Sequence, residues 1–337
     1  MVSLAVMLCV LPWRTDSFAQ GAPDVPEGLD PAVARGLDYL AKRQNSDGSF
    51  DAGEHRVALS GLAVMSYLAC GHTPDAGRYG LTVRAGVDYL LSQAGDDGYF
   101  GRHHGKGMYD QGIVTLALAE AYGVEPDPER RRRMFGALAK AVKVILEAQA
   151  VQKAEEHAGG WRYQRNSPDS DISLSGWNAL ALRAARDVGV DVPKEAVQKA
   201  IGFLLRCYNT QQNGFSYQAG GGAQVGPTGI GVLGLYVLDG TARPELGPAA
   251  KYLADNPVND GTPFQYYSTY YSTLAAYQAG GPVWEKVSKA NFARLLGAQA
   301  TDGSWPKNGQ EPGETYAASM AVLTLSVPYR LLPVYQR

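Results

Sequence analysis

The sequence of 337 residues predicts one all-α domain: a ring of about six helical hairpins in two layers, known as an (α/α)6 barrel or toroid. Two observations predict this fold class. One hairpin unit recurs along the chain, and its two helices differ in how much of their surface is apolar. Residues 34–50 and 84–100 share glycine, Tyr-Leu, Asp-Gly and phenylalanine at a constant shift of 50 residues. Further copies lie in residues 141–163, 200–217, 249–264 and 291–305.

The first segment of each unit is predicted to be an amphipathic helix of the outer layer. In the first unit Val33, Leu37 and Leu40 fall at helical spacing, while Arg35 and Lys42 occupy the opposite face. A turn that usually contains Asp-Gly or Asn-Gly then ends the helix, because glycine tolerates the left-handed backbone found at such ends. The aromatic residue after the turn is expected to pack back onto the helix that it follows.

The second segment of each unit is apolar or small on nearly every side. A helix without a polar face must be buried all round, which places it in an inner layer. These segments are residues 57–70, 113–123, 174–185, 229–238, 269–279 and 316–325.

The alternative to a closed ring is a linear solenoid of the same units. A solenoid needs polar faces on its terminal units, whereas a ring has no open ends to cover. The last stretch, residues 316–335, is largely apolar and carries two prolines that could seal the ring or dock a partner. The pattern therefore favours the closed ring.

The ends and the charge of the chain bear on its location and partners. A net charge of −2 argues against nucleic acid, which requires a basic surface. Residues 4–13 form an apolar run too short to span a bilayer, and Ser17 to Ala19 suit signal peptidase. We therefore expect a signal peptide over residues 1–19, a linker over 20–30 and the toroid over 31–337, in a periplasmic or secreted protein. A buried N-terminal helix is the alternative.

The recurrent pattern resembles the QW motif of squalene-hopene cyclases and related triterpene cyclases: a small residue, aromatic-Leu, Gln, Gly and a second aromatic. The chain is likewise similar to bacterial proteins described only by their prenyltransferase/squalene-oxidase repeats. The resemblance covers nearly all of the predicted toroid and implies the fold of the terpenoid cyclase and protein prenyltransferase superfamily, but fold does not settle function. The matching residues include Gly36, Tyr39, Leu40, Gln44, Gly48 and Phe50 in the first unit, and Gln299, Gly303 and Trp305 in the last.

Residues 167–177 (SPDSDISLSGW), at the start of the third inner helix, hold the candidate catalytic acids. The resemblance implies an Asp-x-Asp-Asp motif at such a place, whose middle acid protonates an alkene. Asp169 and Asp171 match its first two acidic positions, and Ile172 replaces the third. The alternative is structural, since Ser167 as N-cap, Pro168 at the first helical position and Asp169 in the first turn form an ordinary helix start.

Aromatic residues cluster at the starts of the inner helices, where they could line a central cavity. Their faces could stabilise a carbocation, stack on a sugar or fill a packed core. Asp110, Asp171 and Glu314 are candidate carboxylates for glycan chemistry. His55 belongs to a group of loop histidines whose spacing matches no metal motif, so surface histidines are the alternative. The predicted ligand-binding set is Trp177, Tyr109, Asp110, Tyr267, Tyr270, Tyr271, Glu314, Tyr316 and His55.

Several motifs of other ring-shaped proteins are missing from the sequence. The Asp, Cys and His zinc ligands of protein prenyltransferases are absent, because Ser268 stands where the histidine would fall. The chain also lacks the thioester motif Gly-Cys-Gly-Glu-Gln and the DDxxD motif of ionising terpene synthases. We therefore expect neither a metal nor a cofactor.

Two hypotheses for function remain. In the first, the protein is an exported ring that binds a small hydrophobic molecule, a glycan or a protein partner in its cavity or at its rim, without catalysis. In the second, it is an enzyme: a terpene cyclase-like isomerase or lyase that uses Asp171 with Asp169, or else a carbohydrate-active (α/α)6 enzyme with paired carboxylates.

Overall fold

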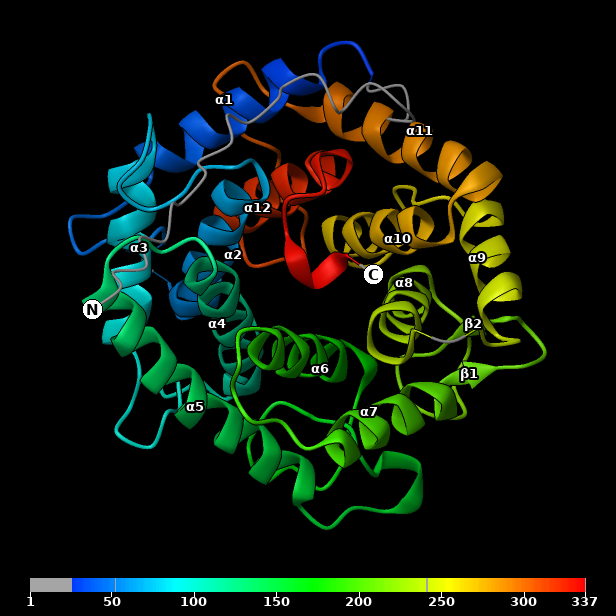
Figure 1. Cartoon of the computed structure of the whole chain (residues 1–337). Coiled ribbons are helices and arrows are strands. Elements are labelled where there is room, and N and C mark those ends of the chain that lie inside the picture. The colour runs from blue at the N-terminus through cyan, green and yellow to red at the C-terminus, as the bar shows by residue number, and fades with distance from the viewer. Residues whose placement is uncertain (1–25, 52, 241, 337) are drawn as a thin grey trace, which may run out of the picture.

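The computed structural model describes residues 26–51, 53–240 and 242–336, which form two concentric rings of α-helices (Figure 1). The predicted signal peptide, residues 1–19, and the first part of the predicted linker lie outside the described residues. Successive helices alternate between the rings, so each hairpin pairs one outer helix with one inner helix. The predicted single-domain (α/α)6 toroid is therefore confirmed.

The bounds of the helices follow the recurring units. The outer ring holds α1 (Leu29–Lys42), α3 (Gly80–Ser92), α5 (Pro128–Ala150), α7 (Lys194–Arg206), α9 (Leu246–Asp255) and α11 (Gly281–Ala298). The inner ring holds α2 (Arg56–Ala69), α4 (Gly107–Tyr122), α6 (Ile172–Asp187), α8 (Val225–Gly234), α10 (Gln265–Ala279) and α12 (Glu314–Leu325). A short antiparallel pair, β1 (Tyr208–Asn209) and β2 (Gly214–Phe215), forms the turn after α7.

The two rings differ in burial as their sequences predict. Outer helix α1 buries Leu29, Val33, Leu37 and Leu40 on one face and leaves Arg35 exposed. Inner helix α2 buries every residue from 57 to 69, whichever side it lies on. Since the wholly apolar helices are surrounded on all sides, they form the core between the outer ring and the central axis.

Contacts between the last and first hairpins close the ring. Ser66 of α2 donates its hydroxyl to the Ser319 carbonyl of α12 at 3.1 Å. Arg43, just after α1, forms an ion pair with Glu314 at the start of α12 (N–O distance 3.2 Å). The chain therefore does not form a linear solenoid.

The glutamine of the repeat motif ties neighbouring units together. The Gln299 side chain donates to the carbonyl of Gly303 in its own turn and to that of Ala32 in α1, at 3.2 and 2.9 Å. Gln44 and Gln149 each make the same pair of bonds, to their own turn and to the next outer helix. Each such glutamine thus ties the carbonyl of its own turn to a carbonyl in the first turn of the next outer helix.

The motif glycine permits this close contact between units. Gly48 and Gly303 have φ angles of 89° and 92°, which side chains rarely adopt. A Cβ on either glycine would lie 2.3 or 2.2 Å from a backbone carbonyl oxygen, of Ala85 or Arg35 respectively. The turns can therefore lie against the next outer helix only with glycine at these positions.

The second unit reaches the same bonds by another route. Gln93 holds the motif position, but its side chain donates to Ser92 beside it. Instead, Gln111 of inner helix α4 donates to the carbonyls of Gly98 and Ala141, at 3.2 and 3.1 Å. The bridge between turn and next outer helix is thus kept although the glutamine comes from a different helix.

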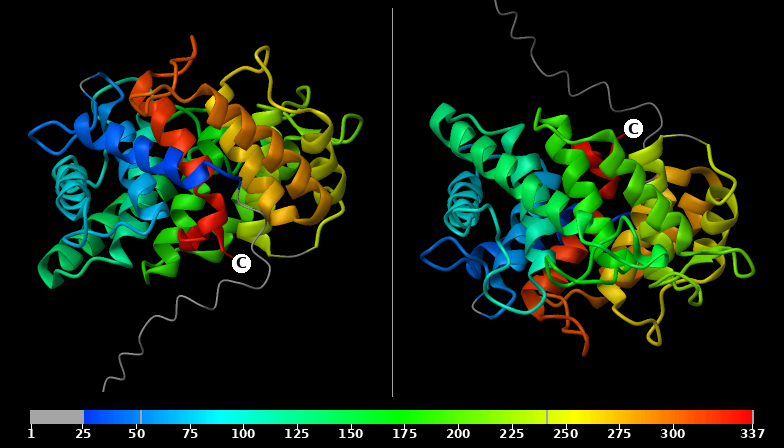
Figure 2. Two further views of the ribbon diagram at one scale, coloured as in Figure 1. Left: turned by 90° about the horizontal axis from the view of Figure 1, so that it is seen from above. Right: turned by 90° about the horizontal axis from the view of Figure 1, so that it is seen from below.

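The central axis of the ring has two different mouths. The inner helices begin at one mouth, where residues from the start of each line a shared cavity. The loops before α10 and α12 project on one side of the ring, and the chain's C-terminal segment lies on the other (Figure 2). That segment contains two 3₁₀ turns, Val327–Tyr329 and Pro333–Tyr335. It seals the ring, one of the two roles that its apolar sequence suggested. Across the described ranges, no helix combines the length and apolarity needed to cross a membrane.

Candidate functional site

A cavity of about 610 Å³ occupies the mouth where the inner helices begin; we call it the helix-start cavity. Every inner helix contributes to it at or near its N-terminal end. Apolar side chains of α2 and α4 form part of its wall, and aromatic and hydroxyl groups form much of the rest. The lining includes Leu59, Leu62, Ile113, Tyr163, Ser173, Tyr217, Phe264 and Glu311.

The predicted ligand-binding residues divide into those on the cavity wall and those away from it. The wall includes His55, Tyr109, Trp177, Tyr267 and Tyr316. The remaining candidates do not line this cavity: Asp110, Asp169, Asp171, Tyr270, Tyr271 and Glu314. The aromatic part of the prediction is thus brought together in space, while the predicted carboxylates are not.

Aromatic rings fill the axis beneath the cavity. The ring of Tyr267 lies 4.9 Å from that of Tyr271, which lies 5.2 Å from Tyr270 and 5.5 Å from Trp177. Tyr270 in turn bonds through its hydroxyl to that of Tyr335 in the C-terminal segment. We call Trp177, Tyr267, Tyr270 and Tyr271 the aromatic partition. It separates the helix-start cavity from a second cavity of about 750 Å³ beside the C-terminal segment, the helix-end cavity.

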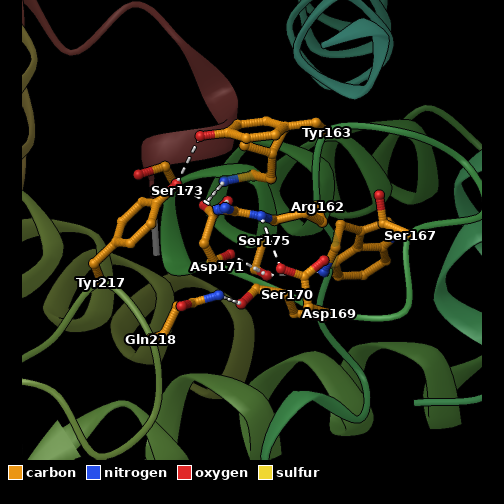
Figure 3. A network of polar contacts seen from close by, with 12 residues as sticks. Arg162, Tyr163, Ser167, Asp169, Ser170, Asp171, Ser173, Ser175, Tyr217 and Gln218 are labelled. Atoms are coloured by element: carbon orange, nitrogen blue, oxygen red, sulfur yellow. Dashed lines mark hydrogen bonds and ion pairs between the residues drawn. The ribbon is translucent and has the colours of Figure 1, made fainter. Parts of the chain in front are cut away.

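Asp171 is the N-cap of α6 and is fully buried (Figure 3). One oxygen accepts the backbone N–H of Leu174 at 2.9 Å, and the other lies 2.6 Å from the Arg162 guanidinium. Burial raises the pKa of Asp171, and the Leu174 N–H and Arg162 oppose that effect. Because both oxygens are engaged inside the protein, this geometry holds the start of α6 in place.

Arg162 organises the rest of that network (Figure 3). It bonds to Asp169 at 3.1 Å and donates to the Tyr217 hydroxyl at 2.6 Å, and that hydroxyl lies 3.1 Å from the hydroxyl of Tyr163. The two predicted acids therefore share one arginine behind the cavity wall. Their catalytic role stays a prediction. The structural alternative is wrong in its detail, because α6 begins at Ile172, capped by Asp171.

Asp110 is also buried and paired. One of its oxygens accepts the backbone N–H of Ala58 at 3.1 Å, and the other lies 2.9 Å from Nε2 of His104. The His104 ring packs edge-on against His55, with 4.7 Å between ring centroids. Burial and the nearby His104 lower the pKa of His55, so this cavity-lining histidine is neutral at neutral pH.

Glu311 is a buried carboxyl group on the cavity wall that sequence reasoning missed. Glu311 lies in the loop just before α12 and is 4% exposed. Oε1 accepts the backbone N–H groups of Tyr266 and Tyr267, in the first turn of α10, at 2.9 and 3.2 Å. Oε2 is buried and has no hydrogen-bond partner among the described residues. Burial raises the pKa of Glu311 to about 7, against the pull of these two N–H groups.

Glu314, the carboxylate predicted for this region, faces elsewhere. Its side chain is 53% exposed and pairs with Arg43, and it also accepts the Tyr39 hydroxyl at 2.9 Å. Glu311 stands only three residues earlier, beside the Pro-Gly pair that precedes the helix. Its position just before an inner helix could have marked Glu311 as a residue near the cavity, but nothing in the sequence connects it with the start of α10.

Phe264 marks the rim of the cavity. It is the N-cap of α10, with φ 49° and ψ 64°, a left-handed conformation that is rare for a bulky residue. Phe264 is 48% exposed although it is large and apolar. Strained backbone and exposed aromatic surface are both common at binding sites.

Among the described residues, no group of three or more His, Cys, Asp or Glu side chains is arranged to hold a metal ion.

Comparison with known proteins identifies the fold only. No family model and no curated protein matches the chain. An inactive α-1,6-mannanase variant, GH76A of Salegentibacter sp. HEL1_6 in complex with α-1,6-mannotriose, is 12% identical with a TM-score of 0.66, covering 90% of this chain and 99% of that one. The type II terpene cyclase MstE from Scytonema is 14% identical with a TM-score of 0.57, covering 92% and 99%. A GH76 α-mannanase from Bacteroides thetaiotaomicron is 12% identical with a TM-score of 0.59, covering 90% and 96%.

Proposed function

We propose that the protein binds a small, mainly apolar molecule of the isoprenoid type in the helix-start cavity. The observation that carries the proposal is the cavity itself: about 610 Å³, within the range of small-molecule sites, and preformed in the fold. Leu59, Leu62 and Ile113 supply apolar wall, and Trp177 supplies a large aromatic face. Half-buried tyrosines give the same wall a few hydroxyls: Tyr109, Tyr163, Tyr217, Tyr267 and Tyr316.

The distribution of carboxylates argues against glycan hydrolysis. Most glycosidases use two carboxyl groups that flank the scissile bond. Among the described residues that line the cavity, Glu311 is the single carboxylate. Asp110 and Asp171 are buried in pairs with His104 and Arg162 instead. The arrangement therefore favours a hydrophobic ligand over a sugar polymer as substrate.

A terpene cyclase-like reaction is the second candidate, because Glu311 combines burial with a pKa of about 7. A carboxylic acid that stays protonated near neutral pH can deliver a proton to an alkene, and aromatic faces such as Trp177 stabilise the cation that forms. A variant of the terpene cyclase MstE has been solved with geranylgeranyl dihydroxybenzoate as its substrate. Under this candidate, Glu311→Gln abolishes product formation from geranylgeraniol, as measured by mass spectrometry, and Asp169→Asn does not.

Binding is tested by fluorescence titration with the isoprenoid ketone farnesylacetone. We expect saturable quenching of tryptophan fluorescence in the wild type, and several-fold weaker binding in Trp177→Phe, measured by calorimetry. Trp284→Phe is the matched control, because Trp284 lines the helix-end cavity. Weaker binding in Trp284→Phe but not in Trp177→Phe would show that the ligand binds in the helix-end cavity, and would refute the proposal. Absence of binding to the wild type would refute it as well.

We also propose that the chain is exported, on the strength of the apolar run at residues 4–13 and the small residues that follow it. Expression of the full chain in a bacterium with a periplasm tests this. Sequencing of the mature protein is expected to find Gln20 at its N-terminus, and an unprocessed cytoplasmic chain would contradict export.

A further inference from the structure

Glu311 holds one oxygen that the protein does not use. Oε1 is fixed by the N–H groups of Tyr266 and Tyr267, so the carboxyl group cannot turn away without breaking both bonds. Oε2 is buried without a partner among the described residues, and Glu311 lines the helix-start cavity. Buried polar atoms are nearly always hydrogen-bonded, so a lone one beside a cavity points to a group that arrives with the ligand.

The charged groups around Glu311 decide whether Oε2 carries a proton. Burial favours the neutral acid, while the two backbone N–H groups and Arg294 of α11 favour the carboxylate, and the resulting pKa is about 7. Tyr316 of α12 is close enough to interact electrostatically with Glu311 and is itself neutral, since burial raises its pKa. His55 and Lys106 also line the cavity. Around neutral pH, a substantial share of molecules therefore holds a proton on Glu311.

We propose that the protonated Oε2 of Glu311 donates a hydrogen bond to an acceptor oxygen of the bound molecule. The ligand is then an apolar skeleton with one carbonyl, ether or hydroxyl oxygen at the end that reaches the loop before α12. This inference rests on the proposed binding function and adds the polar group by which the ligand is oriented. No covalent step is involved.

The direction of the inner helices favours an oxygen over a cation. Each inner helix begins at this mouth, and a helix N-terminus carries partial positive charge. Six such ends surround the cavity, so a ligand ammonium group is disfavoured there even when Glu311 is ionised. A ligand oxygen, which carries partial negative charge, is favoured by the same field.

The test compares three ligands of similar length by calorimetry near pH 6 and near pH 9. They are farnesylacetone, the hydrocarbon with CH2 in place of its carbonyl, and the matching primary amine. Near pH 6 we expect the wild type to bind the ketone about tenfold more tightly than the hydrocarbon, as one buried hydrogen bond provides. Near pH 9 the ratio falls to about one, because an ionised Glu311 has no proton to donate.

Two variants separate Glu311 from a general effect of pH. In Glu311→Gln the amide keeps a donor at the same place and cannot ionise, so the ketone preference persists at both pH values. Glu314→Gln, an exposed site three residues away, retains the wild-type pH dependence. A wild-type ratio that is the same at both pH values overturns this inference but leaves the proposed function intact, and so does tightest binding of the amine. Failure to bind either ketone or hydrocarbon overturns both.

Discussion

Replacement of Glu120 by glutamine is expected to change how the stability of the ring depends on pH. Glu120 lies near the end of inner helix α4 and is 7% exposed. One of its oxygens accepts the backbone N–H of Val334 in the C-terminal segment at 3.1 Å, and the other has no partner among the described residues. Burial raises the pKa of Glu120 from 4.5 to about 8, with the Val334 N–H opposing it.

The sign of the effect follows from proton binding in the two states. Between pH 4.5 and about 8 the folded protein keeps the proton on Glu120, while the unfolded chain has lost it. Stability from this group is therefore present at low pH and is lost as the pH rises through that window. Each full pH unit corresponds to about 1.4 kcal/mol. Because Glu120 is partly protonated in the unfolded chain near pH 5 and partly ionised in the folded protein near pH 8, the rise between them costs about 3 kcal/mol. Glu120→Gln keeps an acceptor for Val334 and has no charge to bury.

Urea unfolding of wild type and variant at both pH values measures this difference. Near pH 5 the two proteins are expected to be about equally stable, and near pH 8 the variant is more stable by about 3 kcal/mol. Other groups such as Glu311 are common to both proteins and cancel. Glu147→Gln, on the exposed surface of α5, is the control and should follow the wild type. A stability difference between Glu120→Gln and wild type that does not change with pH would refute the reasoning.

Three further substitutions test the packing of the ring, each by urea unfolding. Gln299→Ala removes the bond to Ala32 in the first unit and the bond to Gly303 in its own turn, and should cost about 2 kcal/mol. Gln93→Ala, which removes no such bridge, should cost under about 0.5 kcal/mol, and equal losses would contradict the bridging role. Gly229→Ala in α8 places a Cβ 2.6 Å from the backbone of α10 and should lower the free energy of unfolding by about 3 kcal/mol. Gly247→Ala, whose Cβ meets open space, should be neutral or slightly stabilising. An unchanged stability of Gly229→Ala would show that α8 and α10 can move apart at little cost. Asp171→Ala loses the cap of α6 and the buried ion pair with Arg162, and should lower the free energy of unfolding by about 3 kcal/mol. Asp171→Asn keeps the cap and should cost roughly half of that. If neither variant is less stable than the wild type, Asp171 has no structural role.

Much of the candidate site was predictable because it lies at the starts of repeated apolar segments. Tyr109, Trp177 and Tyr267 precede or begin such segments, and helices that share one direction in a ring bring their starts to one mouth. The depth of a residue along its helix was harder to foresee. Tyr270 and Tyr271 are one turn further in than Tyr267, and they fill the axis instead of lining the cavity.

The acids of the site could not be predicted with the same success. Asp171 matched a family pattern, but its burial beside Arg162 depends on a loop whose path no local pattern encodes. Glu311 and Glu314 are alike in sequence, and one is buried on the cavity wall while the other is half exposed at the ring's closing contact. Gln111 likewise replaces Gln93 in the bridge between units because it reaches the same two carbonyls from an inner helix.

By itself the sequence determined the ring, because alternating half-apolar and wholly apolar helices can be buried only in two concentric layers. Hydrophobic periodicity is a local property that repeats along the chain, so it can be recognised in the sequence alone. Only the tertiary structure decided which carboxyl group lies on the cavity wall and which is neutralised by an arginine or a histidine. Desolvation and charge pairing depend on distances between segments far apart in the chain, such as Glu311 and the start of α10.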